Sequence, residues 1–407
     1  MPKFFILTCL VLISLSVNAQ NAVNAIKSNN QVRDTAIKRD LIDIGKTLFK
    51  ITPNPTRPST GERKIFFSAL PIGANVPGGG RALITSTSAG FYTGDRKTTN
   101  ISNVTFTPYW NFKSRFGLPL RSNIWLKNNS WNIQGDTRLL VYPQYTWGLG
   151  RGNEENKLLV NYKYVRFYQS ALKRIQPYMY VGLGYNLDYF INIRTSGDQG
   201  LKEFTGYPYG TTESKNEFSS GVSLNLLYDT RNNSINPMPG CYLNIILRNN
   251  PIYLGSKTNW QSLYIDARKY IPLNKKPHQQ NVLALWTYAW TGLSGSIPYL
   301  NLPSIGWDPY NKSGRGTEQN RYRGKGLLYF EAEYRRDIVD NGLFGFVVFA
   351  NATSVTEPEH NTFTSVHPSV GSGLRIKFNK SSNTNIAIDY GLSKGYHGFM
   401  INLGEAF

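Results

Sequence analysis

The sequence predicts an all-β protein, a transmembrane antiparallel β-barrel of about 16 strands preceded by a short N-terminal amphipathic helix. Three observations lead to this class. Short runs of alternating apolar and polar residues fill most of the chain and end at clusters of Gly, Asn, Asp and Pro. Aromatic residues make up 14% of the 407 residues, whereas charged residues make up only 17%. The last segment of the chain is itself alternating and aromatic.

The composition excludes several other classes of protein. A disordered chain carries fewer aromatic residues and more charge. Two cysteines are too few for a disulfide scaffold, and four scattered histidines leave little room for a metal centre. A mean hydropathy of -0.36, with one long apolar run, does not fit a bundle of membrane helices.

Residues 1–19 have the pattern of a secretory signal peptide. Lys3 supplies the basic start, Phe4 to Val17 form the apolar core, and Val17-Asn18-Ala19 is a small-residue cleavage pattern. An anchoring helix and a lipoprotein acylated at Cys9 are the alternatives, but the run is short and Cys9 lies inside the apolar core. Removing 19 residues and one Lys leaves 388 residues with a net charge of +19, in an exported protein.

Residues 20–63 form a separate N-terminal segment that we expect to be periplasmic. From Asp34 onward the apolar residues have helical spacing, with Asp34 or Thr35 as the cap. The apolar stripe consists of Ile37, Leu41, Ile44 and Leu48. Such a helix can lie on a membrane surface, plug a lumen or dock on its own domain. Three prolines, at positions 53, 55 and 58, then predict a stiff linker.

Residues 64–407 form the predicted barrel. In one strand Leu328, Phe330 and their alternate neighbours share an apolar face, while Glu331, Glu333 and Arg335 lie on the polar face. In a soluble sandwich the apolar face points inward, and in a membrane barrel it points to lipid. The 344 residues, at roughly 21 per strand and connection, give about 16 strands. Closure is required because an open edge in lipid leaves backbone groups unpaired.

Aromatic residues near the predicted strand ends favour the membrane barrel. Such residues form the girdles that flank the lipid-facing band of a transmembrane barrel. The expected girdle residues are Tyr109, Trp110, Tyr142, Trp147, Trp286 and Trp290.

One polar hairpin begins a resemblance to a known family. Tyr228 to Asn233 reads YDTRNN, and Pro237 and Gly240 follow it. Asp229 and Arg231 can pair across the mouth of such a turn. This stretch resembles the signature hairpin of the BamA/TamA-like bacterial surface antigens, which are outer-membrane β-barrels.

A second stretch has the motif order of the same family. Leu302 to Gly306 reads LPSIG, and Arg315-Gly316-Thr317 and Arg321 to Arg323 precede a strand that contains Glu331 and Glu333. In this family a long sixth loop folds back into the barrel with an Arg-Gly-aromatic tip. The resemblance places that tip at Arg315, Gly316 and Thr317, so Thr317 replaces the aromatic residue.

The partner of Arg315 is the second departure from the family. Phe349 to Val355 resembles the wall strand that supplies an aspartate, but Asn351 stands at that position and brings no charge. Glu331 and Glu333 are the substitute partners, since both lie on the polar face of their strand. The alternative is that both glutamates simply offset the basic lumen.

The end of the chain resembles the family's final strand, which the cell's barrel assembly machinery recognises. Four residues of this strand are expected to share one face: Phe399, Ile401, Leu403 and Phe407. The chain lacks an obvious counterpart of the periplasmic POTRA modules that family members usually carry. It therefore resembles a POTRA-less member.

No motif predicts catalysis, so we expect no enzyme, no cofactor and no metal. Gly292 to Ser296 does not fit a G-x-S-x-G nucleophile elbow. Basic residues concentrate between positions 311 and 325. In an exported barrel, outer-membrane lipids and lipopolysaccharide suit them better than nucleic acid does.

The resemblance implies a protein of the Gram-negative outer membrane that acts in membrane protein insertion, translocation or lipid handling. A weak seam between the first strand, near Ile65–Leu70, and the last strand would open sideways. The alternatives are a passive pore for anionic solutes and a scaffold subunit that holds a periplasmic or lipoprotein partner through the N-terminal helix.

Overall fold

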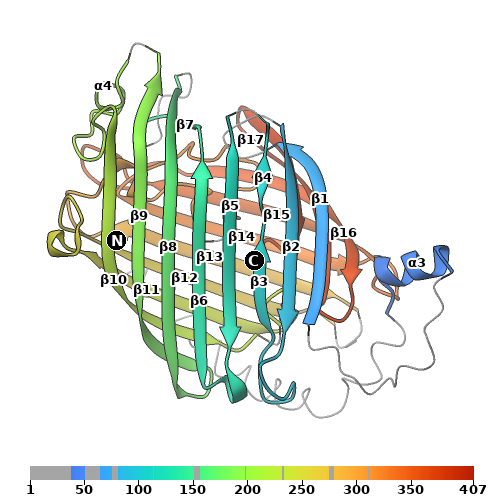
Figure 1. The fold of residues 1–407 in the computed structure, drawn as a ribbon. Helices are drawn as coiled ribbons and strands as arrows, with labels where there is room; N and C mark the ends of the chain where they lie inside the picture. Colours follow the sequence, from blue (N-terminus) through green and yellow to red (C-terminus); the bar gives the residue numbers. More distant parts are fainter. Residues whose placement is uncertain are drawn as a thin grey trace.

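The structure is a computed structural model in which the strands form one barrel wall (Figure 1). It describes residues 38–50, 65–75, 81–112, 114–150, 156–197, 199–231, 233–274, 279–309 and 311–407. The predicted signal peptide, its cleavage site and the proline linker lie outside these residues.

Within the described residues, eighteen strand segments make up the wall. They are β1 (Ile65–Asn75), β2 (Arg81–Phe91), β3 (Ser102–Phe106), β4 (Tyr109–Trp110), β5 (Phe116–Trp125), β6 (Trp131–Val141), β7 (Gln144–Thr146), β8 (Leu158–Gln176), β9 (Met179–Ser196), β10 (Lys215–Asp229), β11 (Gly240–Asn250), β12 (Trp260–Pro272), β13 (Asn281–Gly292), β14 (Gly326–Asp337), β15 (Phe344–Val355), β16 (His367–Asn379), β17 (Thr384–Ser393) and β18 (Tyr396–Leu403). Short helical turns lie in the connections: η2 (Lys127–Asn129), α4 (Leu201–Thr205), η3 (Ile252–Leu254) and η4 (Tyr299–Asn301).

The segments form 16 strands, as the sequence predicts. β3 and β4 both pair with β2 and β5, so they are one interrupted strand. β6 and β7 both pair with β8 and form another. Eighteen segments minus these two interruptions give 16 antiparallel strands.

The wall has one weak place, between its first and last strands. Antiparallel registers join each strand to the next from β1 to β18. β1 and β18 lie close together. Within the described part of the chain, however, no register and no backbone hydrogen bond joins them. This place is called the seam below.

Alternation sorts the side chains of each strand between lipid and lumen. In β14, Phe330 is 48% exposed on the outer face, whereas Glu331 and Glu333 are fully buried inside. In β10, Leu224 is 52% exposed and its neighbour Asn225 is buried. The apolar face therefore points outward, as expected for a barrel in lipid rather than for a soluble sandwich.

The predicted aromatic girdle is largely wrong. Trp110 is 51% exposed on the outer face, but Tyr142, Trp147 and Trp286 are buried. The strand register explains Trp286, because this residue lies opposite Glu331 and shares its lumen-facing side. Most of these aromatic side chains therefore fill the lumen.

The N-terminal helix is shorter than predicted. α3 spans Leu41–Leu48, and residues 38–40 are not helical. Asp40 caps it by accepting a hydrogen bond from the main-chain N–H of Asp43 at 2.8 Å, whereas the predicted caps lie outside the described residues. None of the helices in the described ranges is long and apolar enough to cross a membrane.

α3 lies outside the barrel wall, beside the end of β16 (Figure 1), and polar contacts dock it there. Asp40 Oδ2 accepts the main-chain N–H of Lys380 at 2.8 Å, and Lys380 Nζ lies 2.7 Å from Asp43 Oδ2. Two residues of the apolar stripe stay exposed, Leu48 at 74% and Ile44 at 40%. The helix is therefore docked on its own barrel and does not plug the lumen.

We expect Lys380→Ala to weaken this docking by less than about 1 kcal/mol, because the ion pair is partly exposed. Partial burial raises the pKa of Asp43, but the hydrogen bond and charge of Lys380 outweigh it and hold the pKa below its ordinary value. The contribution of Asp43 is therefore present above the unfolded-state pKa of about 3.9 and is lost as the pH falls through the folded-state pKa.

Hydrogen exchange of the amides of Leu41–Leu48 measures the docking. Protection, measured against the intrinsic exchange rate at each pH, should fall a few-fold in Lys380→Ala at pH 7. In the unchanged protein it should fall as the pH drops through the lowered folded-state pKa of Asp43. Lys50→Gln, at the exposed end of the helix, is the matched control and should change nothing. Equal exchange in all three proteins at pH 7 would contradict the docking.

Candidate functional site

The candidate site is built around loop 6 (residues 293–325), which connects β13 to β14 and folds into the lumen. Buried apolar residues hold it there, among them Ile297, Tyr299, Leu302 and Ile305. On one side Tyr142 donates a hydrogen bond to Gln319 at 2.6 Å. The loop therefore crosses the lumen as a packed element.

A carboxylate inside loop 6 shapes its turn. Asp308 Oδ1 accepts hydrogen bonds from the main-chain N–H of Lys312 at 3.1 Å and of Ser313 at 2.9 Å. Gly314 N–H donates to the hydroxyl of Tyr329 on β14 at 3.1 Å. This turn directs Arg315 toward the wall.

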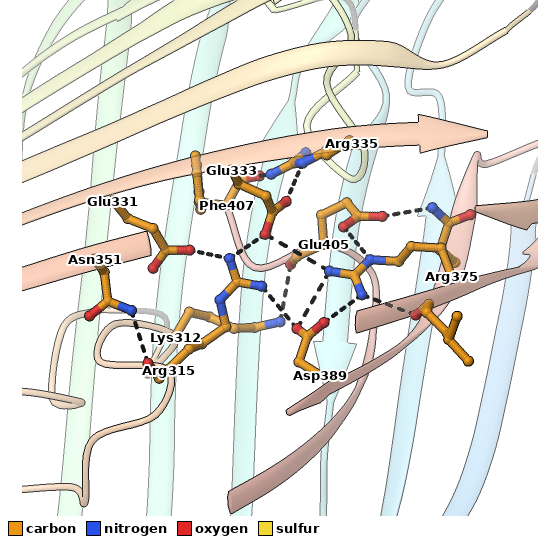
Figure 2. A network of polar contacts seen from close by, with 12 residues as sticks. Lys312, Arg315, Glu331, Glu333, Arg335, Asn351, Arg375, Asp389, Glu405 and Phe407 are labelled. Atoms are coloured by element: carbon orange, nitrogen blue, oxygen red, sulfur yellow. Dashed lines mark hydrogen bonds and ion pairs between the residues drawn. The ribbon is translucent and has the colours of Figure 1, made fainter. Parts of the chain in front are cut away.

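Arg315 is 1% exposed and meets three carboxylates (Figure 2). Nη1 lies 2.9 Å from Asp389 Oδ2 on β17, and Nη2 pairs with both Glu331 and Glu333 on β14. The guanidinium carbon lies 3.8 Å from the ring centroid of Phe349 on β15. One side chain of loop 6 thus contacts three strands of the wall. These contacts match the substitute partners expected from the sequence and add Asp389, which the sequence reasoning missed.

Two further arginines extend the ion-pair network (Figure 2). Arg335 pairs with Glu333. Arg375 Nη1 lies 2.6 Å from Asp389 Oδ1, and its Nε lies 2.8 Å from Glu405 Oε2. Three arginines and four carboxylates are therefore buried together, and each buried charge has an opposite charge beside it.

The rest of the predicted tip contacts the wall through the backbone and a hydroxyl. Gly316 has φ +86°, and a Cβ added there would lie 2.8 Å from the main-chain nitrogen of Leu392 on β17. Thr317 Oγ1 lies 2.8 Å from Ser369 Oγ on β16. Asn351 Nδ2 donates to the carbonyl of Arg315 at 2.9 Å, so it holds the backbone and not the guanidinium.

The predicted face of the last strand is wrong at one of its four residues. Phe399, Ile401 and Leu403 alternate on β18, and Phe399 is 71% exposed. β18 ends at Leu403, and Gly404 has φ +96°. The chain therefore turns into the lumen there. Phe407 is 5% exposed inside the barrel, and an oxygen of its terminal carboxylate accepts a hydrogen bond from Arg335 at 2.9 Å.

The signature hairpin, residues 230–239 between β10 and β11, lies at the end of the barrel opposite the entry of loop 6. Arg231 pairs with Asp229 through two contacts, Nε at 2.9 Å and Nη2 at 2.7 Å. Gly240 opens β11 with φ +131°, and a Cβ there would lie 2.8 Å from Arg231 Cα. Pro237 is buried in the same turn.

This hairpin also extends across that end of the barrel, which the sequence did not reveal. Asn233 Nδ2 donates to the carbonyl of Ser382, in the turn between β16 and β17, at 3.2 Å. Ile235 packs with Phe66 of β1 and with Ile101. The hairpin therefore touches the wall on both sides of the seam.

Residues 75–407 match the Omp85 superfamily domain. The chain belongs to the Omp85 superfamily. The match covers 333 of the 407 residues, and the fold is that of an Omp85 outer-membrane β-barrel. The family resemblance expected from the sequence is thereby confirmed.

Three solved structures are similar to this chain at low sequence identity, and the two CdiB structures share its fold. CdiB from Escherichia coli is 11% identical with a TM-score of 0.55, over 84% of this chain and 62% of that chain. CdiB from Acinetobacter baumannii is 12% identical with a TM-score of 0.54, over 84% and 60%. BamA from Haemophilus ducreyi lacking POTRA domains 1–3 is 16% identical with a TM-score of 0.49, over 84% and 69%.

This Omp85 chain thus spans about three fifths of the length of the CdiB chains that it resembles. No curated protein matches its sequence. Among the residues that the structure describes, no group of three or more His, Cys, Asp or Glu is arranged to hold a metal ion.

Proposed function

We propose that this Omp85 barrel acts in the insertion or translocation of outer-membrane proteins, or in handling their lipids, by opening sideways at the seam. The observation that carries the proposal is that β1 and β18 are neighbours without a backbone register in the described chain. Unpaired backbone groups in lipid are costly, each by several kcal/mol. A client strand or a lipid headgroup that pairs with them is therefore favoured.

The last strand is suited to such an exchange. β18 has only 8 residues and pairs with β17 from Tyr396 to Leu403. Beyond it the chain leaves the wall for the lumen. Separating β18 from β1 thus breaks little existing structure.

Loop 6 supports the proposal as a brace beside the seam. Its tip contacts β14 through Glu331, β16 through Ser369 and β17 through Asp389. These strands stay together through the tip when the seam opens. Arg315 holds the tip in place through its ion pairs with β14 and β17.

Disulfides across the seam test the proposal in cells, in a Cys241→Ser background. Ser68 of β1, which faces the lumen, is paired in turn with Gly398 and with Met400 of β18, each as cysteine. We expect the pair that oxidises to reduce outer-membrane protein assembly or lipid balance until a reductant is added. The control is the register pair Ala69 and Thr87 in β1 and β2, whose oxidation should be harmless. Normal growth and membrane composition with a fully oxidised seam would sink the proposal.

Partners form the finer part of the proposal. Outer-membrane lipids and lipopolysaccharide would contact the apolar wall, and the barrel assembly machinery would act during biogenesis after export through the signal peptide. The exposed Leu48 and Phe49, each 74% exposed, support a periplasmic or lipoprotein partner that covers α3. Affinity purification of the tagged chain from outer membranes, with Leu48→Glu for comparison, tests this. If the same proteins co-purify with both chains, α3 does not bind the partner.

A passive pore for anionic solutes is the rival role, and we propose no enzymatic role. Loop 6 crosses the lumen and packs against both walls, which favours a closed barrel. Planar-bilayer recording of the unchanged protein should therefore be silent. A steady anion-selective current would favour the pore instead.

A further inference from the structure

A cavity of about 470 Å³ remains in the lumen beside loop 6. This volume is within the range of small-molecule sites, about 300–1,000 Å³. Its lining combines aromatic rings with an unusual number of cations. Five of these cations are Arg121, Arg138, Arg166, Arg248 and Lys312.

Three of the arginines share one carboxylate, Asp136 on β6. Arg138 takes both of its oxygens, at 2.8 and 2.5 Å. Arg166 Nη1 is 3.2 Å away, and Arg121 Nε is 3.8 Å away. Arg121 Nε is buried and has no hydrogen-bond partner. Arg138 and Arg166 thus occupy the oxygens of Asp136, and Arg121 Nε is left without a hydrogen-bond acceptor.

Lys312 brings a further cation from loop 6. Arg138 donates to the carbonyl of Pro309 and to Asn311 Oδ1, both at 2.9 Å, which places the chain just before Lys312 over Asp136. Lys312 Nζ donates to the carbonyl of Glu405 at 3.2 Å. Within the described chain no carboxylate lies within 4 Å of this ammonium group.

The remaining carboxylates nearby do not balance these cations. Asp188 pairs with Arg248 at 2.8 Å and with Arg166 at 3.6 Å, and Asp308 is bound by its own turn. Five cations therefore face three carboxylates, an excess of two positive charges. In the Arg315 network, four side-chain carboxylates and the terminal carboxylate of Phe407 accompany three arginines. The positive excess is therefore local to the cavity, where Arg121 lies 3.8 Å from its nearest carboxylate and the described ion pairs give Lys312 none.

We propose that this cavity is an anion site that binds a phosphate group between Arg121 and Lys312. Arginine and lysine are the side chains that recognise phosphate, the first through its planar fork and the second as a point charge. The cavity is larger than a single phosphate needs, which suits a phosphorylated small molecule or headgroup. This inference does not rest on the proposed function.

Isothermal titration calorimetry of the full chain in a phosphate-free, non-ionic detergent tests the site. Inorganic phosphate, glycerol 3-phosphate and glucose are titrated at low ionic strength. We expect saturable one-site binding of inorganic phosphate and no binding of glucose. Tighter binding of glycerol 3-phosphate would identify a headgroup as the natural source, and equal binding would identify free phosphate.

Arg121→Gln and Lys312→Gln should each weaken phosphate binding by about tenfold or more. Arg121→Lys, which keeps the charge, should retain part of it. Lys202→Gln, an exposed cation on α4, is the control and should bind normally. Thermal unfolding with and without phosphate provides a second readout, since a ligand that binds the folded state raises Tm.

Three results would overturn the site. The first is binding that no variant changes, and the second is no saturable binding at all. The third is competition by chloride at the same concentration as phosphate, because the lumen would then hold only a diffuse counter-ion atmosphere. If a Gln variant has a lower Tm than the unchanged protein in the absence of phosphate, it is misfolded or destabilised. The phosphate binding of Arg121→Lys then decides whether the site exists.

Discussion

Arg315→Ala should lower the free energy of unfolding of the barrel by about 3–5 kcal/mol, the largest effect expected from a single substitution in this chain. Arg315 is the common partner of Glu331, Glu333 and Asp389. Its removal leaves buried carboxylates near each other without the charge that compensates them. Urea unfolding of the refolded barrel, followed by its altered migration in electrophoresis, measures the loss.

A double substitution separates the lost charge from the lost packing. Among the described ion pairs, Glu331 pairs with Arg315 alone, whereas Glu333 also pairs with Arg335. Adding Glu331→Gln to Arg315→Ala should therefore recover part of the stability. Arg321→Ala, a half-buried cation in the same loop, is the control and should cost less than about 1 kcal/mol. If Arg315→Ala lowers the free energy of unfolding no more than Arg321→Ala does, Arg315 does not hold loop 6 against the wall.

Gly391→Ala and Gly316→Ala should displace the tip of loop 6 and open a current through the barrel. A Cβ at Gly391 would lie 2.6 Å from the main-chain nitrogen of Gly316, and the contact is between backbones that cannot rotate away. Overpacking of this kind costs about 1–3 kcal/mol. The tip then moves from β17, and planar-bilayer recording should show openings that the unchanged protein lacks.

Gly395→Ala is the matched control for these glycines. Gly395 has a left-handed φ of +74°, like Gly316, but a Cβ there meets nothing within 4 Å. Gly395→Ala therefore introduces the backbone strain of a left-handed alanine but no close contact with loop 6. Silent recordings from Gly391→Ala, or equal currents from all three variants, would show that the contact between the tip and β17 does not close the lumen.

The sequence predicts the parts of this site that depend on strand periodicity. Glu331 and Glu333 are two residues apart, so they share the lumen face whatever the register is. Asp389 meets the same arginine from a strand more than fifty residues later, and such an encounter depends on how loop 6 packs in three dimensions. Its place on the polar face of a late strand was the only signal.

The errors have equally local causes. The place of Trp286 near a strand end predicts a girdle position, but its register partner Glu331 shows that it faces inward. Phe407 follows Leu403 by an even number of residues, but Gly404 breaks the strand between them. Period-two reasoning fails once a left-handed residue redirects the chain.

The hairpin of residues 230–239 gives the seam a hinge. Ile235 packs on Phe66 at the start of β1, and Asn233 bonds to Ser382 beside β17. Because the hairpin contacts both sides of the seam at one end of the barrel, the two sides separate most easily at the opposite end. If the seam opens as proposed, the wall would open as a wedge, widest on the side where loop 6 enters and narrow at the hairpin.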